Sequence, residues 1–318
     1  MTQVQSGLLR GPRAVLNSYG GMGTVLREFG LVALLDAALR EGWHRGGALI
    51  WRLLPGKRSG KYGLLEAILF PSYDYWLRYQ RVKVAITANS PHALPDILEV
   101  GCGRSGIALF LKPSSARVCL VDRTVGNVLP RYSAATQYVR ADACHLPFED
   151  SSFPIVISVD TLEHIPREAR LAFLRELKRV AKEMVILTCP LDSQDGRFQA
   201  GKFDAQLCED LKKHNRRIPR WLEEHLACGH PRLEELMQEF EGARLDGWQH
   251  CESWERFQTL QLWPFLWIFG GIFYWAILQK HDTTSPFWRG ILSWQKRETA
   301  EIVEQDEETL SSREGVYR

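Results

Sequence analysis

The segment from Asp96 to Gly106 constrains the fold more than any other part of the sequence. Asp96–Val100 (DILEV) has the apolar character of a buried β-strand, and the turn Gly101–Gly106 (GCGRSG) follows it directly. Ile107–Leu111 then predicts the start of a helix. In such a unit the glycines let the backbone approach a ligand, and the helix start offers free N–H groups. The segment therefore predicts a nucleotide-type site in a parallel α/β sheet, although a tight turn without a ligand also fits this motif taken alone.

Further strands and acidic residues follow in a regular order. Short β-branched runs alternate with helical stretches between residues 86 and 250, as in parallel βαβ units. We expect strands over 117–121, 137–140, 155–159, 184–187 and 242–250. Three of them are followed within two residues by an acid: Asp122, Asp142 and Asp160. A single aspartate there is more often a helix cap. Three behind one glycine turn favour a binding site, because ligands of such sheets bind at the carboxyl ends of the strands.

Composition and charge exclude several classes of protein. The 318 residues are 45% hydrophobic and 25% charged, which excludes a wholly disordered chain, a collagen-like repeat and a polytopic membrane protein. The formal net charge is +2, so no overall field favours nucleic acid, and we expect no nucleic-acid partner. Seven cysteines without CxxC spacing indicate a reduced, intracellular protein rather than a disulfide scaffold.

The sequence pattern divides the chain into three zones. We expect a helical N-terminal extension over residues 1–85, an α/β domain over 86–255, and an appendage over 256–318 that holds an apolar segment and a polar tail. The apolar segment is Leu262–Leu278 (LWPFLWIFGGIFYWAIL). As a helix it would rise about 25 Å, less than the roughly 30 Å of a hydrocarbon core. Three interpretations remain open: a buried helix pair, a segment lying in a membrane surface, and a spanning helix.

Five motifs of the central zone resemble the class I S-adenosylmethionine-dependent methyltransferases, in particular the type 11-like group. In chain order they are ILEVGCGRSG, VCLVDR, ADACHLPFEDSSF, ISVDTLEHI and VILTCP, within residues 95–190. The resemblance implies a Rossmann-like, mostly parallel sheet of about seven strands with helices on both faces. It also implies S-adenosyl-L-methionine as the cofactor and transfer of its methyl group to an acceptor.

The resemblance assigns cofactor-binding roles residue by residue. The residues that would line the methionine and ribose pocket are Glu99, Gly101 and Gly103, with Gly106 closing the same turn. Asp122 would bind the ribose hydroxyls. The residues that would hold the adenine are Asp142 and Ala143. Asp160 would face the methionine or methyl end. Two departures leave the shape of the loop open: Ser105 stands where the family often has its third glycine, and Pro154 stands where an aspartate is common.

Two other functions compete with methyl transfer. A nicotinamide-dependent dehydrogenase also uses GxGxxG followed by an acid. However, Glu99 stands where dinucleotide folds usually have an apolar residue, and ADACHLPFEDSSF has no counterpart in such enzymes. A catalytically silent protein that binds a ligand or serves as a scaffold remains open, because no motif fixes the acceptor side.

Catalytic and metal-binding candidates are weaker. A base near the methyl group would help methylation of a hydroxyl, and Asp160 and His164, with Glu163, follow the fourth expected strand. A packing or hydrogen-bonding role is the alternative for His164. We expect no metal, because the histidines and cysteines near residue 230 lack a familiar zinc-ligand spacing. These residues are His225, Cys228, His230, His250 and Cys251.

Basic and aromatic segments bear on location. The first 61 residues carry a local net charge of +6, and Lys212–Arg220 is a second basic run. A solvated helix face explains such a run, and so does a patch for phosphate or lipid headgroups. Residues 1–13 lack the apolar core of a secretory signal, so we expect a cytoplasmic protein. We favour contact with a membrane surface through Leu262–Leu278, and a freely soluble enzyme is the alternative. The expected acceptor is a small-molecule, glycan or lipid-linked hydroxyl.

Overall fold

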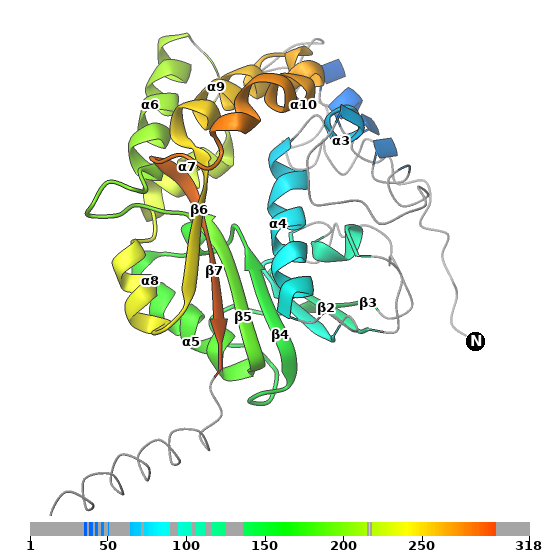
Figure 1. Cartoon of the computed structure of the whole chain (residues 1–318), viewed down its shortest axis with the longest axis vertical. Helices are drawn as coiled ribbons and strands as arrows, with labels where there is room; N and C mark the ends of the chain where they lie inside the picture. The colour runs from blue at the N-terminus through cyan, green and yellow to red at the C-terminus, as the bar shows by residue number, and fades with distance from the viewer. Residues whose placement is uncertain are drawn as a thin grey trace, which may run out of the picture.

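The computed structural model describes residues 35–36, 38–40, 42–43, 46–47, 50, 64–70, 73–89, 95–103, 106–111, 116–124, 136–214, 216 and 218–296. Its seven strands are β1 (Ile97–Val100), β2 (Val118–Asp122), β3 (Thr136–Arg140), β4 (Phe153–Val159), β5 (Ala181–Pro190), β6 (Arg244–His250) and β7 (Phe287–Gln295). They form one sheet in the order β3-β2-β1-β4-β5-β7-β6 (Figure 1). Strands β1 to β5 are parallel, and β7 is antiparallel to both β5 and β6. The prediction of a mostly parallel, Rossmann-like sheet is confirmed.

The strand β7 comes from a part of the chain where we expected no strand. It pairs Arg289 with Pro190 of β5 and with Trp248 of β6. Its apolar side chains are buried on both faces of the sheet, and the buried Arg289 interrupts their run. The alternation typical of a strand is therefore hidden. The sheet extends past residue 255, where we expected the α/β domain to end.

Helices cover both faces of the sheet (Figure 1). On one face lies α4 (Tyr73–Asn89), and on the other lie α5 (Arg170–Val180) and α8 (Leu233–Glu239). Alternate residues of each strand feed the two cores: Ile157 of β4 packs in the same core as Trp76 of α4, whereas Val156 shares the other core with Phe173 of α5. Because α4 lies on the sheet, it belongs to the α/β layers, although it falls within the zone expected as an N-terminal extension.

A second group of helices gathers beyond the carboxyl ends of the parallel strands (Figure 1). These helices are α6 (Ala200–Lys213), α7 (Arg220–Cys228) and α9 (Cys251–Leu262). Helix α7 contacts the 3₁₀ turn η4 (Leu162–His164) that follows β4, and both α6 and α9 contact β7. This group, called the helical cap below, covers the end of the sheet at which ligands bind in α/β folds.

The apolar segment Leu262–Leu278 folds into short turns. The last residue of α9 is Leu262, and η6 (Leu266–Phe269), α10 (Gly270–Phe273) and the π-helical turn η7 (Tyr274–Leu278) follow. The inward side chains are Trp267, Tyr274 and Leu278. The large apolar side chains that are at least 36% exposed are Trp263, Phe265, Leu266, Phe269, Ile272, Trp275 and Ile277. Among the helices that the structure describes, none is long and apolar enough to cross a membrane.

Two of the predicted segments lie largely outside the described residues. Of the N-terminal extension, α3 (Leu64–Leu69) and α4 are helical, as expected, and α3 contacts α10. Residues 1–34, which hold part of the predicted basic zone, and residues 297–318, which include the predicted polar tail Glu301–Arg318, lie outside the description.

Candidate functional site

The glycine turn after β1 adopts a backbone that favours glycine at three positions. Gly101, Gly103 and Gly106 have φ values of +81°, +57° and +56°, in the left-handed region that L-residues with a Cβ rarely adopt. The N–H groups of Gly101 and Cys102 donate to the carbonyl of Val121 at 2.8 and 3.1 Å, which ties the turn to the end of β2. A Cβ on Gly101 would overlap the side chain of Thr161. The turn therefore requires glycine for both its conformation and its packing.

Glu99 is buried beneath this turn, and its role in cofactor binding stays a prediction. Its side chain is 0% exposed. The hydroxyl of Tyr79 donates to Oε1 at 2.9 Å, and the N–H of Ile107 donates to Oε2 at 2.5 Å. A Cβ on Gly106 would overlap Oε2 of Glu99, so this glycine makes room for the carboxyl group. Burial raises the pKa of Glu99 to about 7.

The structure at Ile107 differs from the helix that was predicted to begin there. Within the described residues it is a single 3₁₀ turn, η2 (Ile107–Leu109), and its first N–H is already bonded to Glu99. Gly103 instead marks the open side of the glycine turn. It is exposed, and no atom described lies within 4 Å of the place where its Cβ would be. Gly103 is therefore the glycine of this turn at which the described residues leave open space.

The acids after β2 and β3 lie at the carboxyl edge of the sheet, as predicted. Asp122 is half-exposed, and its Oδ2 accepts a hydrogen bond from the N–H of Gly103 at 2.9 Å. Its Oδ1 accepts from the N–H of Thr124 at 2.9 Å. Asp142 is exposed and accepts from the N–H of Cys144 at 2.9 Å, and Ala143 beside it is half-buried. Strand β2 lies between β1 and β3, so the glycine turn and both acids share one edge.

Asp160 follows β4 with a left-handed backbone, φ +49°. Its side chain is only 6% exposed. Oδ2 accepts from Nη1 of Arg78 at 2.8 Å and from Nη2 of Arg289, and Oδ1 accepts from the hydroxyl of Thr188 at 3.1 Å. Two guanidinium groups and a hydroxyl thus hold this carboxylate. These contacts occupy the carboxylate, which disfavours the role of a general base.

Arg289 is the centre of this polar network. Its guanidinium is 1% exposed and donates to Oδ1 of Asp74 at 2.6 Å and to Oε1 of Gln249 at 2.7 Å. The rings of Trp248 and Trp288 lie 4.9 and 4.7 Å from its guanidinium carbon. Contacts of cations with aromatic faces and with two carboxylates offset the loss of hydration of a buried charge. The network joins α4, β4, β6 and β7 above the carboxyl edge.

His164 lies on the far side of the same region, against α7. Its Nδ1 is 2.9 Å from Oε2 of Glu224, and its ring centre is 4.8 Å from that of His225. Burial lowers the pKa of His164, and the neighbouring His225 lowers it further. Burial and the neighbouring His225 therefore both favour the neutral form of this ring. A catalytic role of His164 stays a prediction.

The residues weighed as zinc ligands do not gather as a set. His225 and His230 lie close together, with ring centres 5.4 Å apart, and both contact Asp204. Cys228 donates its thiol to the carbonyl of His164. His250 and Cys251 join neither of the two described groups of closely spaced His and acidic side chains. All seven cysteines are free thiols, in agreement with a reduced protein.

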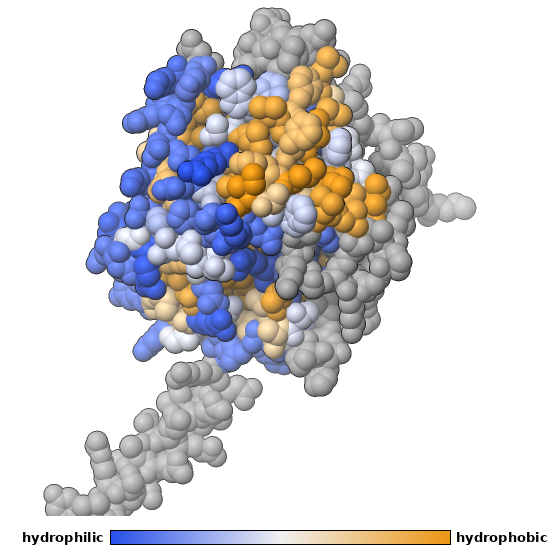
Figure 2. Space-filling model, turned by 45° about the horizontal axis from the view of Figure 1, so that its top comes forward, coloured by the Kyte–Doolittle hydropathy of each residue, from blue (hydrophilic) through white to orange (hydrophobic). Residues whose placement is uncertain are grey.

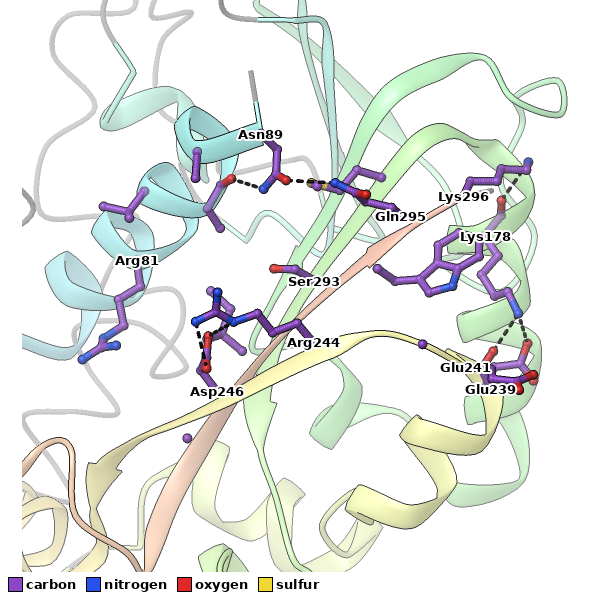
Figure 3. Close-up of a pocket in the computed structure, with 18 of the residues that line it drawn as sticks. Arg81, Asn89, Lys178, Glu239, Glu241, Arg244, Asp246, Ser293, Gln295 and Lys296 are labelled. Carbon is purple, nitrogen blue, oxygen red and sulfur yellow. Dashed lines mark hydrogen bonds and ion pairs between the residues drawn. The ribbon is translucent and has the colours of Figure 1, made fainter. Parts of the chain in front are cut away.

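A groove lined by both polar and apolar residues lies away from these residues, between the C-terminal half of α4 and the strands β6 and β7 (Figure 3). Arg244 and Asp246 form an ion pair in it at 2.9 Å, and Gln295 donates to Asn89 at 3.0 Å. Met184, near the amino end of β5, also lines it. None of the residues predicted to bind the cofactor lines this groove, so it is separate from the carboxyl edge.

Four residues of the site were not predicted from the sequence. Asp74, Arg78 and Tyr79 come from α4, and Arg289 comes from β7. Helical periodicity shows that α4 has an apolar face, but it does not show that Arg78 reaches Asp160 across 82 positions of the chain. The one local signal for Arg289 was a cation inside an apolar run.

Comparison with known proteins identifies the central segment. The family described as "Methyltransferase domain" matches residues 98–189. A probable S-adenosylmethionine-dependent methyltransferase of Mycobacterium tuberculosis is 32% identical over 117 residues, which cover 34% of this chain and 39% of the relative. A sterol 4-C-methyltransferase of Caenorhabditis elegans is 28% identical over 168 residues, or 50% of this chain and 43% of the relative. The chain thus spans about two fifths of the length of these curated relatives.

Among solved structures, the magnesium protoporphyrin IX methyltransferase of Synechocystis PCC 6803 with bound SAH has a TM-score of 0.44 and 13% identity. The match covers 81% of this chain and 98% of that chain. The matched family segment, 98–189, contains every residue that we predicted to bind the cofactor. Residues 98–189 therefore match the methyltransferase domain family, and one relative that matches this chain is itself named a probable S-adenosylmethionine-dependent methyltransferase.

Proposed function

We propose that the chain is an enzyme that transfers the methyl group of S-adenosyl-L-methionine to an acceptor with an apolar, lipid-like body. The observation that carries methyl transfer is the left-handed glycine turn, open at Gly103, with the half-exposed carboxylate of Asp122 beside it. These groups fit the ribose of the cofactor, and Asp142 and Ala143 at the end of β3 suit its adenine. The bound cofactor supplies an activated methyl group.

The protein's own part in this reaction is to align the acceptor and to exclude water. The helical cap lies above the carboxyl edge and suits both tasks. Asp160 has its carboxylate bound by Arg78 and Arg289. We therefore propose that Asp160 fixes the shape of the acceptor side and does not take the proton of the acceptor.

An apolar surface supports the lipid-like class of acceptor. The side chains at this surface, called the apolar patch below, are Trp263, Phe265, Leu266, Phe269, Ile272, Trp275 and Ile277. Figure 2 shows apolar side chains gathered on one face of the molecule, next to hydrophilic ones. Contiguous exposed apolar surface of this kind marks an interaction site in many proteins. One relative named above also acts, by its name, on a sterol.

Cations border the apolar patch and favour an anionic bilayer as its partner. Arg216 lies over the ring of Trp263, with its guanidinium carbon 4.0 Å from the ring centre. Lys212 and Lys213 are exposed in the last turn of α6. Each cation near an anionic leaflet contributes about 1 kcal/mol, and tryptophan favours the interfacial level. We propose that the patch rests on the cytoplasmic face of a membrane, where a lipid-linked acceptor is within reach.

Two measurements test the reaction. Calorimetry with S-adenosyl-L-methionine should show binding near one equivalent, and absence of binding by the folded protein would refute the proposal. Incubation with cofactor and a total lipid extract should then yield S-adenosylhomocysteine and a methylated lipid. If the cofactor binds and the full set of extract fractions, lipid and aqueous, gives no product, the chain is instead a catalytically silent binding protein.

Flotation with phosphatidylserine vesicles tests the membrane contact separately. The full chain should float with the vesicles at low salt, and the double variant Phe269→Ser, Trp275→Ser should remain in the soluble fraction. Leu171→Ser is the matched control, because Leu171 is 46% exposed on α5, outside the apolar patch. Equal flotation of the double variant and the full chain would contradict membrane contact through the patch.

A further inference from the structure

Three side chains with metal-ligating atoms meet between η4 and α7. Glu163 and His164 come from the 3₁₀ turn after β4, and His225 comes from α7, which contacts that turn. One ligand atom of each lies within 4.8 Å of the other two. Oε1 of Glu163 and Nε2 of His225 are 3.9 Å apart. Two ligands of one zinc ion, each about 2.1 Å from it, are separated by about 3–4 Å, so small side-chain rotations complete such a site.

Glu163 is the reason to look for a ligand here. Its side chain is 1% exposed, and its Oε2 makes no hydrogen bond within the part of the chain that the structure describes. A carboxyl oxygen that is buried without a partner is costly, and such a group in a folded protein calls for an explanation. A cation bound by Glu163 would provide the missing partner.

His225 is oriented as a metal ligand would be. Its Nδ1 is 2.8 Å from Oδ2 of Asp204, which is itself buried. With Nδ1 as the donor to this carboxylate, Nε2 is left on the side of Glu163 as a metal-ligating atom. A carboxylate behind a ligating histidine is the usual support of a metal site. The alternative trio of Asp204, His225 and His230 is less suitable, because Oδ2 of Asp204 already contacts both histidines.

His164 connects the cluster to solvent. Its side chain is 31% exposed, whereas those of Glu163 and His225 are 1% and 4% exposed. Glu224 stands 2.9 Å from Nδ1 of His164 and fixes the ring from the outer side. The cluster thus has one ligand at the surface and two in the interior.

We propose that Glu163, His164 and His225 bind one divalent transition-metal cation, with Zn²⁺ as the best match. Two imidazole nitrogens and one carboxylate are a common zinc donor set that leaves a fourth position for water. The same set is a poor match for Ca²⁺ and Mg²⁺, which prefer oxygen ligands. The site gives His164 a role other than that of a general base, and it does not depend on methyl transfer being the reaction.

The experiment uses the untagged full chain, stripped of metal with a chelator. Calorimetric titration with ZnCl₂ should show one equivalent bound. Co²⁺ should give visible absorption of a nitrogen- and oxygen-ligated ion, without the near-ultraviolet band of a cobalt–thiolate bond. Glu163→Gln keeps the shape of the side chain and should weaken Zn²⁺ binding at least tenfold. Asp204→Asn, behind His225, should weaken it about 10- to 100-fold, and His281→Gln, at an exposed histidine outside the cluster, should leave it unchanged.

Several results would overturn the site. They are the absence of stoichiometric Zn²⁺ binding to the full chain, a cobalt–thiolate band, and binding to Glu163→Gln as tight as to the full chain. Circular dichroism checks that each variant is folded. If Glu163→Gln does not fold, His164→Gln replaces it, because the half-exposed ring is less involved in packing, and undiminished binding to that variant would equally refute the proposal.

Discussion

Replacement of Glu99 by glutamine should remove a large pH dependence from the stability of the fold. The buried carboxyl group has its pKa raised from an ordinary 4.5 to about 7. Between these two values the folded chain keeps the proton and the unfolded chain loses it. A rise in pH through this window therefore favours the unfolded state. A shift of about 2.5 units at 1.36 kcal/mol per unit corresponds to about 3 kcal/mol of lost stability above pH 7. Glutamine stays neutral and keeps the acceptor for the N–H of Ile107.

Urea unfolding of the full chain and of Glu99→Gln, repeated at steps from pH 4.5 to pH 8, measures this effect. The stability of the full chain, relative to that of the variant, should decrease by about 3 kcal/mol across the series. Glu209→Gln is the control, because Glu209 is exposed on α6 and its variant should follow the full chain at every pH. A difference between Glu99→Gln and the full chain that is constant with pH would refute the reasoning, since Glu99 would then ionise with an ordinary pKa.

Other substitutions test the turn, the cofactor contact and the buried network. Gly101→Ala should destabilise the fold by at least about 1 kcal/mol more than Gly229→Ala. Both glycines have a positive φ, but only at Gly101 would the added Cβ lie within 4 Å of another side chain. Equal losses in urea unfolding would contradict this. Asp122→Ala should weaken binding of S-adenosyl-L-methionine by about 1–3 kcal/mol in calorimetry, and unchanged affinity would mean that the carboxylate serves only the turn. Arg289→Met should lower the unfolding free energy by about 3–5 kcal/mol, because it leaves two carboxylates with one fewer cation, whereas the exposed Arg197→Met should change it by less than about 0.5 kcal/mol.

The parallel part of the sheet was predictable because each of its strands has a recognisable pattern in its own short stretch of sequence. Ile97–Val100 and Ile155–Val159 are short apolar runs, and each ends at a glycine or an acid. By contrast, β7 was missed because it is buried on both faces and carries Arg289, so that neither alternation nor uniform hydrophobicity marks it. The conformation of the third turn glycine was also not readable in advance, since Gly106 accommodates a carboxyl group that only the folded chain brings near it.

The candidate site shows the same division. The sequence order placed Asp122 and Asp142 at the ends of neighbouring strands, because parallel βαβ units bring such ends together. The partners of Glu99 and Asp160 were not predictable, since Tyr79, Arg78 and Arg289 lie far from them along the chain and belong to other elements. Local patterns indicate where a carboxylate lies, but the charge that neutralises it depends on tertiary packing.

The buried network around Arg289 has a consequence for how the chain can be divided. It joins a helix that precedes the family segment 98–189 to a strand that follows that segment, and both meet at Asp160. A chain shortened to residues 86–255 would lose Arg78, Tyr79 and Arg289 together, and would leave the carboxyl groups of Glu99 and Asp160 buried without them. We therefore expect the segment that matches the methyltransferase domain family to depend for its stability on residues that lie outside it on both sides.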